Sequence, residues 1–234
     1  MFKRNFKKAD EEEENVFWVT MSDLLLGLTM VFMTLFVLAM TGFTQNKMQQ
    51  QAIQSDVAKE LIKNMKEKNI NAQIDKLTGQ VKIPDLELFN VGSYSLSDKG
   101  KLYLDKFVPI YINTIFSNSK LSDKIVNIVI QGHTDSQSFI NTTSEEQQFI
   151  KNMDLSIKRA SAVEEYLFKT NYNKKYTDKL TKLISVEGKS FTEPILTNGK
   201  EDFAKSRRVE LKLVVKESNI QDFLKIDKKA SSKG

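Results

Sequence analysis

One apolar stretch near the N-terminus limits what the rest of the chain can fold into. Residues 16–43 contain no Lys, Arg, His or Glu, and their single ionisable residue is Asp23. A helix needs about 20 apolar residues to cross the hydrocarbon core of a bilayer, and this run is longer than that. We therefore expect residues 16–43 to form one transmembrane helix.

The carboxylate inside this stretch is its most unusual feature. An ionised Asp at the centre of a membrane helix costs roughly 2.5–3.5 kcal/mol on insertion scales, so it normally faces a partner or a water-filled path. The residues at steps of three and four from Asp23 share its helix face and include small and hydroxyl side chains: Gly27, Met30, Thr34, Val37 and Thr41. Such residues favour contact between membrane helices. We infer that Asp23 points at other protein helices. The alternative is an Asp near the helix end that reaches the headgroups.

Flanking charges predict the orientation of this helix. Lys3, Arg4, Lys7 and Lys8 precede it, whereas the first cations after it are Lys47 and Lys59. The positive-inside rule therefore places the N-terminus in the cytoplasm and the C-terminal bulk outside. A cleaved signal peptide is the competing interpretation. The apolar run is too long for it, and no A-x-A-like site follows.

Composition excludes several classes of function. The chain has no Cys and one His, which excludes a disulfide framework and a thiolate metal site and disfavours His-based zinc sites and a Ser-His-Asp triad. The net charge is +5, but the Lys residues are spread out and form no nucleic-acid-reading motif. We expect no cofactor, no metal site, no nucleic-acid partner and no enzymatic activity.

The segment that follows the membrane helix, residues 44–71, is polar and rich in Gln and Lys. Its apolar residues recur every four positions, a narrow helical stripe made of Ile53, Val57, Leu61 and Met65. One interpretation is a solvated helical stalk. The other is a juxtamembrane helix that pairs with its copy or blocks an ion path until activation. The sequence does not choose between them.

Residues 72–216 have the pattern of a single α+β domain in which strands and helices form a layered sandwich. We expect a hairpin or strand pair around residues 73–83 and a loop at 84–92. The β-branched run 125–131 predicts a strand buried on both faces, and 183–187 and 209–215 predict two further strands. Ser97 is the expected N-cap of a helix that ends near Phe116, and a second helix is expected from about Asn152 to Lys169. Residues 217–234 are polar and read as a C-terminal tail.

Five short motifs follow one another through this domain. They are Leu88-Phe89-Asn90-Val91-Gly92-Ser93, then Gly132-His133-Thr134-Asp135, then Asn152-x-x-Leu155-Ser156-x-x-Arg159-Ala160, then Gly188…Pro194, and Ser206-Arg207-Arg208-Val209-Glu210. Their order resembles the OmpA-like peptidoglycan-binding domain. The resemblance implies that Asp135 and Arg159 hold the zwitterionic end of a diaminopimelate residue in the wall peptide.

The same resemblance gives pocket positions to Thr134, Asn152 and Arg207. Guanidinium and carboxylate groups suit this ligand, because a guanidinium forks onto a carboxylate and a carboxylate accepts from an ammonium. The alternative is a mutual salt bridge between Asp135 and Arg159 that holds strand to helix. His133 is expected to pack or to cap the turn. The chain departs from the family pattern in the 16 residues that separate Asp135 from Asn152, in Gln137-Ser138 replacing a Gly, and in Ser206 replacing an Asn.

The membrane segment carries a second resemblance. The sequence from Phe17 to Met30, with Trp18 five residues before Asp23, resembles the membrane helix of the MotB family of ion-driven motor subunits, and most of all the ZorB type of the Zorya anti-phage systems. The resemblance implies that Asp23 takes up and releases H⁺ or Na⁺. It also implies a MotA/ZorA-like multi-span partner, a homodimer and a wall-anchored periplasmic domain on a single-pass inner-membrane protein. The alternatives are a flagellar stator subunit and a non-motor wall anchor of the OmpA or Pal kind.

The expected organisation is therefore a cytoplasmic tail at 1–15, a membrane helix at 16–43, a linker helix at 44–71, an OmpA-like domain at 72–216 and a tail at 217–234.

Overall fold

The computed structural model describes residues 2–117, 119–137, 139, 142 and 144–216. The expected C-terminal tail, residues 217–234, lies outside these. The chain divides into two compact units. Among the described residues, one runs from Phe2 to Met48 and the other from Gln49 to Lys216.

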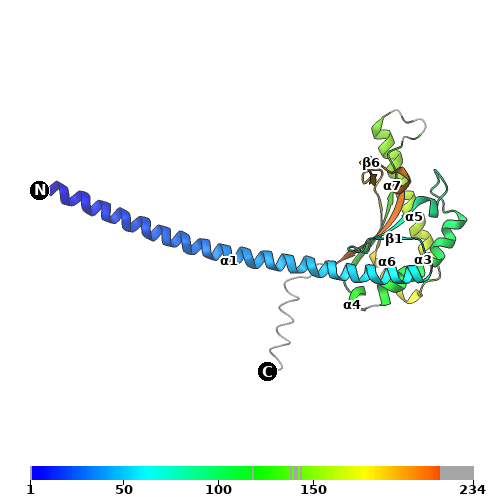
Figure 1. The fold of residues 1–234 in the computed structure, drawn as a ribbon, viewed down its shortest axis with the longest axis horizontal. Coiled ribbons are helices and arrows are strands. Elements are labelled where there is room, and N and C mark those ends of the chain that lie inside the picture. The colour runs from blue at the N-terminus through cyan, green and yellow to red at the C-terminus, as the bar shows by residue number, and fades with distance from the viewer. Residues whose placement is uncertain (1, 118, 138, 140–141, 143, 217–234) are drawn as a thin grey trace, which may run out of the picture. The chain divides into compact units, whose positions relative to one another are not determined.

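Helix α1 (Phe2–Glu67) supplies the whole described part of the first unit (Figure 1). Its apolar stretch has a mean hydropathy of 2.3 over an 18-residue window, none of which is buried within the chain. By length and composition, this is a helix that could cross a membrane. The helix begins at Phe2 and ends at Glu67, so the residues expected to form the N-terminal tail and most of the linker are helical as well.

The second unit is built on a five-stranded sheet of order β1-β2-β7-β3-β4. Its strands are β1 (Gln73–Ile74), β2 (Val81–Pro84), β7 (Arg208–Val215), β3 (Ile125–His133) and β4 (Ile184–Gly188). Only β3 and β4 run parallel, and the other three pairs are antiparallel. The expected β1–β2 hairpin is confirmed, and its turn includes Gly79 with a φ of +69°. The buried strand is confirmed too, because β3 lies between β7 and β4.

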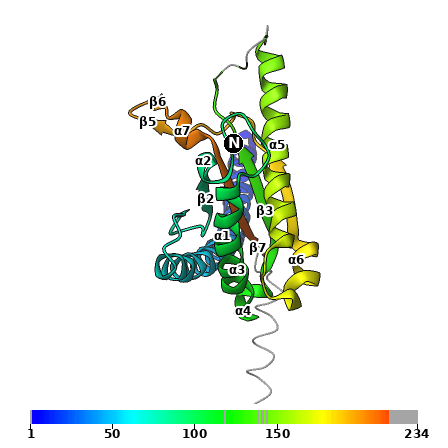
Figure 2. The same ribbon diagram turned by 90° about the vertical axis from the view of Figure 1, so that its right-hand side faces the viewer.

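Figure 2 shows α3 (Asp98–Ser117) and α5 (Glu145–Lys169) running alongside the strands. The other helices of this unit are short: α2 (Asp85–Leu88), α4 (Ser119–Ser122), η1 (Lys174–Tyr176), α6 (Thr177–Leu183) and α7 (Phe203–Ser206). A two-stranded ribbon of β5 (Leu196–Thr197) and β6 (Lys200–Glu201) precedes α7. Mixed helix and sheet in one layered domain is the expected α+β class.

The start of α3 is confirmed at the predicted cap. Ser97 Oγ accepts a hydrogen bond from the Gly100 amide at 3.0 Å, which satisfies one of the free N–H groups of the first turn. Gly100 is required here, because a Cβ atom at this position would lie 2.2 Å from the carbonyl oxygen of Leu88. The helix therefore packs directly on α2.

Two helix boundaries differ from the sequence prediction. The segment 84–92, expected to be a loop, contains α2 as a one-turn helix. Helix α5 begins at Glu145 rather than near Asn152, because Ser144 caps it by accepting from the Gln147 amide at 3.2 Å. Part of the long connection between Asp135 and Asn152 is therefore extra helix at the start of α5.

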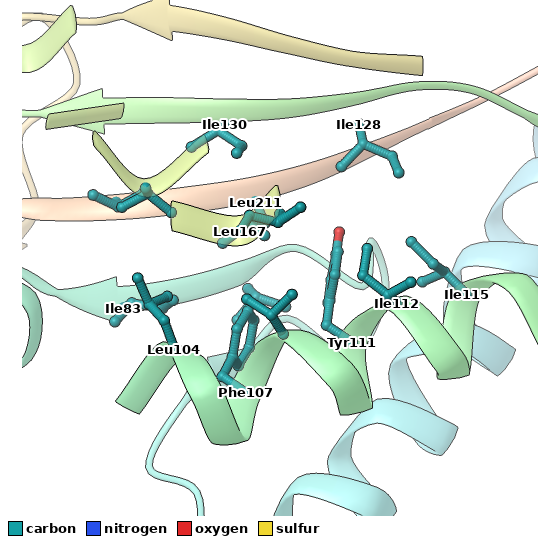
Figure 3. Close-up of a cluster of buried hydrophobic side chains, with 14 of the residues drawn as sticks. Ile83, Leu104, Phe107, Tyr111, Ile112, Ile115, Ile128, Ile130, Leu167 and Leu211 are labelled. Carbon is teal, nitrogen blue, oxygen red and sulfur yellow. The ribbon is translucent and has the colours of Figure 1, made fainter. Parts of the chain in front are cut away.

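The core of the domain lies between the sheet and α3 (Figure 3). Ile83, Leu104, Phe107 and Ile130 are fully buried there. The stripe Val57, Leu61 and Met65 of α1 joins the same core, at 2%, 0% and 2% exposure, and Ile53 packs against it. Neither interpretation of the linker foresaw this, since a free stalk and a pairing or blocking helix both leave the stripe outside the domain. The core thus begins well before the expected boundary at residue 72.

Candidate ligand-binding site at the end of the sheet

Three neighbouring strands end in register at one edge of the domain. Pro84 of β2 and His133 of β3 both pair with Arg208 of β7. The Asp85 amide continues this register by donating to the Arg207 carbonyl at 3.1 Å. Because side chains alternate between the faces of a sheet, Asp85, Arg207 and Thr134 come next on the face opposite to His133 and Arg208.

Helix α5 approaches this edge closely, for a reason visible in the sequence. A Cβ atom on Gly132 would lie 2.0 Å from the carbonyl oxygen of Ser156, so only glycine allows the contact. The Ser156 hydroxyl also accepts from the Ser190 amide at 3.2 Å, which ties α5 to the segment after β4. Arg159 lies one turn further along α5. The motif residues Gly132 and Ser156 thus bring the Arg159 side chain to the strand ends.

Arg159 is 2% exposed and makes an ion pair that the sequence analysis missed. Its Nη2 lies 3.1 Å from Oδ2 of Asp85, whose side chain is 3% exposed. Its Nε donates to the Ser93 carbonyl at 2.9 Å, and the Phe89 ring lies 5.4 Å from the guanidinium carbon. The alternative of a direct Asp135–Arg159 salt bridge was wrong, because the partner of Arg159 is Asp85.

Asp135 instead pairs with Arg207. Arg207 Nη1 forms an ion pair with Oδ2 of Asp135 and also donates to Gln137 Oε1 at 3.4 Å. The Gln137 amide donates to Oδ1 of Asp135 at 3.3 Å. Asp135 is nearly buried, whereas the Arg207 side chain is 29% exposed. Arg207 is therefore the more accessible of the two guanidinium groups.

The other two predicted residues are buried beside this cluster. Thr134 Oγ1 finds no hydrogen-bond partner among the residues that the structure describes. Asn152 donates through Nδ2 to the Gln148 carbonyl of its own helix at 3.1 Å, and Gln148 Nε2 donates to the Ser136 carbonyl at 3.2 Å. The structure thus brings Thr134, Asp135, Arg159 and Arg207 together. Asn152 instead supports the segment after β3.

Burial dominates the electrostatics of the Asp85–Arg159 pair. It raises the pKa of the Asp85 carboxyl to about 6 although Arg159 and Arg207 oppose the shift. It also lowers the pKa of the Arg159 guanidinium, which Asp85 only partly offsets. A buried ion pair of this kind carries a desolvation cost that its attraction only partly repays. The site therefore has no net charge, since the carboxylates of Asp85 and Asp135 balance the guanidinium groups of Arg159 and Arg207. Its assembly carries a desolvation cost.

Sequence reasoning missed Asp85 because the residue lies in a segment expected to be a loop and outside the motifs. Its one signal was its place directly after the hairpin strand β2, where a carboxylate at a strand end can reach the neighbouring strands' ends. Neither periodicity nor spacing identifies its partner, which lies 74 residues further along the chain on α5.

On the opposite face of the sheet, His133 has no role in this cluster. The side chain is 1% exposed, and burial lowers its pKa to about 3, so it is neutral at pH 7. Its Nε2 lies 3.7 Å from Glu210, a buried carboxylate that Arg208 already holds at 2.5 Å. The expectation that His133 packs is confirmed. Neither ring nitrogen is hydrogen-bonded within the described part of the chain, so it caps no turn there.

The second candidate site is Asp23 in the apolar part of α1. Its side chain and those of its neighbours on the helix are exposed within this chain. The hydroxyl of Ser22 donates to the Trp18 carbonyl at 2.7 Å, and that of Thr34 to the Met30 carbonyl at 2.8 Å. These hydroxyl donors are thus satisfied by their own helix. Asp23 belongs to a helical surface that the described residues of this chain do not cover.

Known proteins resemble the chain over most of its length. The OmpA family matches residues 88–208. Zorya protein ZorB of Escherichia coli strain Crooks is 33% identical over 223 residues, which is 90% of this chain and 92% of that protein. Zorya protein ZorB of Escherichia coli O139:H28 is 24% identical over 221 residues, 88% of this chain and 83% of that protein.

A solved structure shares the fold. A MotB-like protein from Desulfovibrio vulgaris aligns with 74% of this chain and 97% of its own, at a TM-score of 0.51 and 19% identity. The fold, the OmpA-family match and the identity to ZorB over nearly the whole chain agree with one another. The chain therefore belongs to the ZorB family, as a MotB-like protein that carries an OmpA-family domain.

Proposed function

We propose that this protein is the MotB-like subunit of an ion-driven motor in the bacterial inner membrane, anchored to peptidoglycan and acting in anti-phage defence. The observation that carries the proposal is Asp23, the one ionisable residue of the apolar stretch 16–43, in a helix long and apolar enough to span a membrane. The relatives named Zorya protein ZorB support the assignment to defence.

In this proposal Asp23 binds a proton or Na⁺ and then releases it. Uptake neutralises the carboxylate, and release restores its charge, so the free energy of its contacts with neighbouring helices changes in each cycle. A single helix cannot enclose an ion path. The motor therefore needs a MotA/ZorA-like multi-span subunit around α1, and a homodimer of this chain would present two such carboxylates.

The domain would hold the wall through the cluster at the end of the sheet. A diaminopimelate end group offers a carboxylate and an ammonium, and the cluster offers groups of both opposite signs. Arg159 and Arg207 would take the carboxylate, Asp135 the ammonium, and Thr134 an additional hydrogen bond. Asn152 would keep the segment after β3 in place. A motor held in this way has a fixed reference against which a partner can turn.

The test is phage plating on a host that carries this protein and its natural membrane partner. Asp23→Asn keeps the size of the side chain and removes the titratable group. Asp56→Asn is the matched control, because Asp56 is on the same helix outside the apolar stretch and its side chain is 76% exposed. Membrane levels of all three proteins are compared by immunoblot.

We expect the wild type and Asp56→Asn to protect and Asp23→Asn to lose protection. Equal protection by all three would overturn the ion-driven motor and leave a non-motor wall anchor. If the wild type gives no protection, the defence assignment fails, and rescue of motility in a host lacking its flagellar stator would then test the flagellar alternative.

A further inference from the structure

The guanidinium proposed to receive the ligand is already occupied by a carboxylate of the chain itself. Arg159 holds Oδ2 of Asp85 at 3.1 Å through Nη2, and its Nε is taken by the Ser93 carbonyl at 2.9 Å. Both side chains are at least nine-tenths buried, at 2% and 3% exposure. Asp85 therefore competes with a ligand carboxylate for Nη2, the nitrogen that either bidentate edge of the guanidinium uses.

The contact between Asp85 and Arg159 satisfies only half of the carboxylate. Oδ1 of Asp85 is buried and has no hydrogen-bond partner among the described residues. The hydroxyl oxygen of Thr134, on the same face of the sheet, is also buried and has no hydrogen-bond partner among the described residues. A buried polar atom without a partner costs about 1–3 kcal/mol. The closed arrangement therefore leaves two acceptors that a donor entering the site would satisfy.

We propose that Asp85 occupies the position on Arg159 that a carboxylate of the wall peptide takes, so that binding exchanges one carboxylate for another. Asp85 thereby sets the affinity of the site and restricts it to ligands that bring a carboxylate of their own. This inference rests on the wall binding proposed above.

The charges balance in both states. Two carboxylates, Asp85 and Asp135, face two guanidinium groups, Arg159 and Arg207. A diaminopimelate end group adds one carboxylate and one ammonium, so the site stays neutral after the exchange. The ligand carboxylate replaces Asp85 on Arg159, and Asp135 accepts from the ammonium. A diamine without a carboxylate has nothing to offer Arg159 and does not bind.

The arrangement predicts a measurable cost in affinity. When only a fraction of the free protein is open, the apparent dissociation constant is the intrinsic one divided by that fraction. Asp85→Asn removes the charge that holds Arg159 and keeps an amide oxygen that can still accept from it. We therefore expect this variant to bind about tenfold more tightly than the wild type, as for a site that is open about a tenth of the time.

The experiment uses the full chain in detergent micelles. Co-sedimentation with purified peptidoglycan sacculi measures binding, and titration with meso-diaminopimelate measures the affinity for the end group. Asp98→Asn is the matched control, because the Asp98 side chain is 98% exposed. Arg159→Ala removes the ligand-binding guanidinium, and circular dichroism checks that each variant is folded.

Tighter binding by Asp85→Asn with an unchanged Asp98→Asn supports the exchange. Equal or weaker binding by Asp85→Asn, when the wild type binds and Arg159→Ala does not, overturns the exchange and leaves the wall-binding function intact. If the wild type and Asp85→Asn both fail to bind sacculi and diaminopimelate, wall binding itself fails, and the exchange fails with it.

A measurement on the wild type keeps the test independent of how the variant folds. The charged groups that face Asp85 are Arg159 on α5, Arg207 after α7 and Asp135 after β3. Burial raises the pKa of Asp85 to about 6, so acid neutralises it and releases Arg159. Wild-type affinity should rise as the pH falls from about 7.5 to about 5.5, on either side of this value. A pH profile that is flat, or that falls toward acid, overturns the exchange.

Discussion

The apolar segment of α1 and the domain that begins at Gln49 contain the same kinds of residue in opposite surroundings. Leu28 is 62% exposed and Leu61 is fully buried. Asp23 is exposed, whereas Asp85 is 3% exposed and ion-paired. A Cβ on Gly27 would meet nothing within 4 Å, but one on Gly132 would meet a backbone oxygen at 2.0 Å. The domain supplies the neighbours of its own side chains. The side chains of the apolar segment have no such neighbours among the described residues of the chain.

This contrast separates effects on stability from effects on function. A substitution in the domain should alter the free energy of unfolding of the domain. The same substitution in the apolar segment should leave that free energy unchanged and affect only function. All six tyrosines lie in the domain and the single Trp lies in α1. Near-ultraviolet circular dichroism of tyrosine in the full chain therefore reports on the domain.

The largest effect is expected when Asp85 of the domain is compared with Asp23 of the apolar segment. Asp85→Ala leaves the guanidinium of Arg159 buried without its counter-ion, which should cost about 3–5 kcal/mol of domain stability. Asp23→Ala should cost the domain nothing measurable and should abolish phage protection. Urea denaturation followed by the tyrosine signal measures the first, and plating measures the second. Equal stability of the two variants would show that the Asp85–Arg159 pair is not held in the folded domain.

The leucine pair tests whether the end of α1 belongs to the domain. Leu61→Ala removes a fully buried side chain and should destabilise the domain by about 3 kcal/mol, within the range for such truncations. Leu28→Ala should leave the urea midpoint of the domain unchanged. A Leu61→Ala protein with a wild-type midpoint would mean that the stripe is not part of the core.

Asp85 and His133 should make opposite contributions to the pH dependence of domain stability. Asp85 has a raised pKa, from 3.8 to about 6, so its contribution is present below its unfolded value and is lost as the pH rises through about 6. A pKa shift of this size corresponds to a contribution of less than about 3 kcal/mol to the free energy of unfolding. His133 has a lowered pKa, from 6.5 to about 3, so its contribution is present above 6.5 and is lost as the pH falls.

The two contributions oppose each other between about pH 6 and about pH 4. Asp85→Asn removes the one that favours acid, so its stability should fall more steeply on acidification than that of the wild type. Asp23→Asn should reproduce the wild-type profile. Urea midpoints across this pH range measure all three, and parallel profiles for Asp85→Asn and the wild type would contradict the buried titration.

The smallest of these effects is expected for the glycine pair. Gly132→Ala forces α5 away from the end of β3 and should cost about 2 kcal/mol, the usual scale for overpacking. Gly27→Ala should not change the domain at all, because nothing lies within 4 Å of its Cβ position. If Gly132→Ala unfolds at the wild-type urea concentration, the close approach of α5 to β3 is relaxed without cost.

Much of the domain could be predicted because its signals are local. Ser97 caps α3 through atoms three residues away, and the β-branched run 125–131 forms β3 between two other strands. The cap and the strand depend on composition and spacing within a few turns of chain. Thr134, Asp135, Arg159 and Arg207, which the fold brings together, were given instead by the resemblance of their motifs to the OmpA-like domain.

The remaining features depend on contacts between distant segments. The partner of Arg159 is Asp85, which precedes the first motif and has no periodic pattern around it. The stripe at Val57, Leu61 and Met65 has the spacing of any helix face, and its spacing alone cannot tell whether a bilayer, a second copy or a sheet covers it. Asp23 could be identified from the sequence alone, because an ionisable residue in an apolar run stands out whatever its tertiary contacts are.

The burial of that stripe also constrains the order in which the domain can be made. Gln54 Nε2 donates to the Leu213 carbonyl at 3.4 Å, a contact that joins positions 159 residues apart. Strand β7, which accepts this bond, lies between β2 and β3 and is the last strand in the described part of the chain. Until it emerges during biosynthesis, the sheet is split in two and the stripe has no complete cover. A ribosome that stops before residue 208 should therefore release no partly working domain, only a chain in which the apolar stripe of α1 is left exposed.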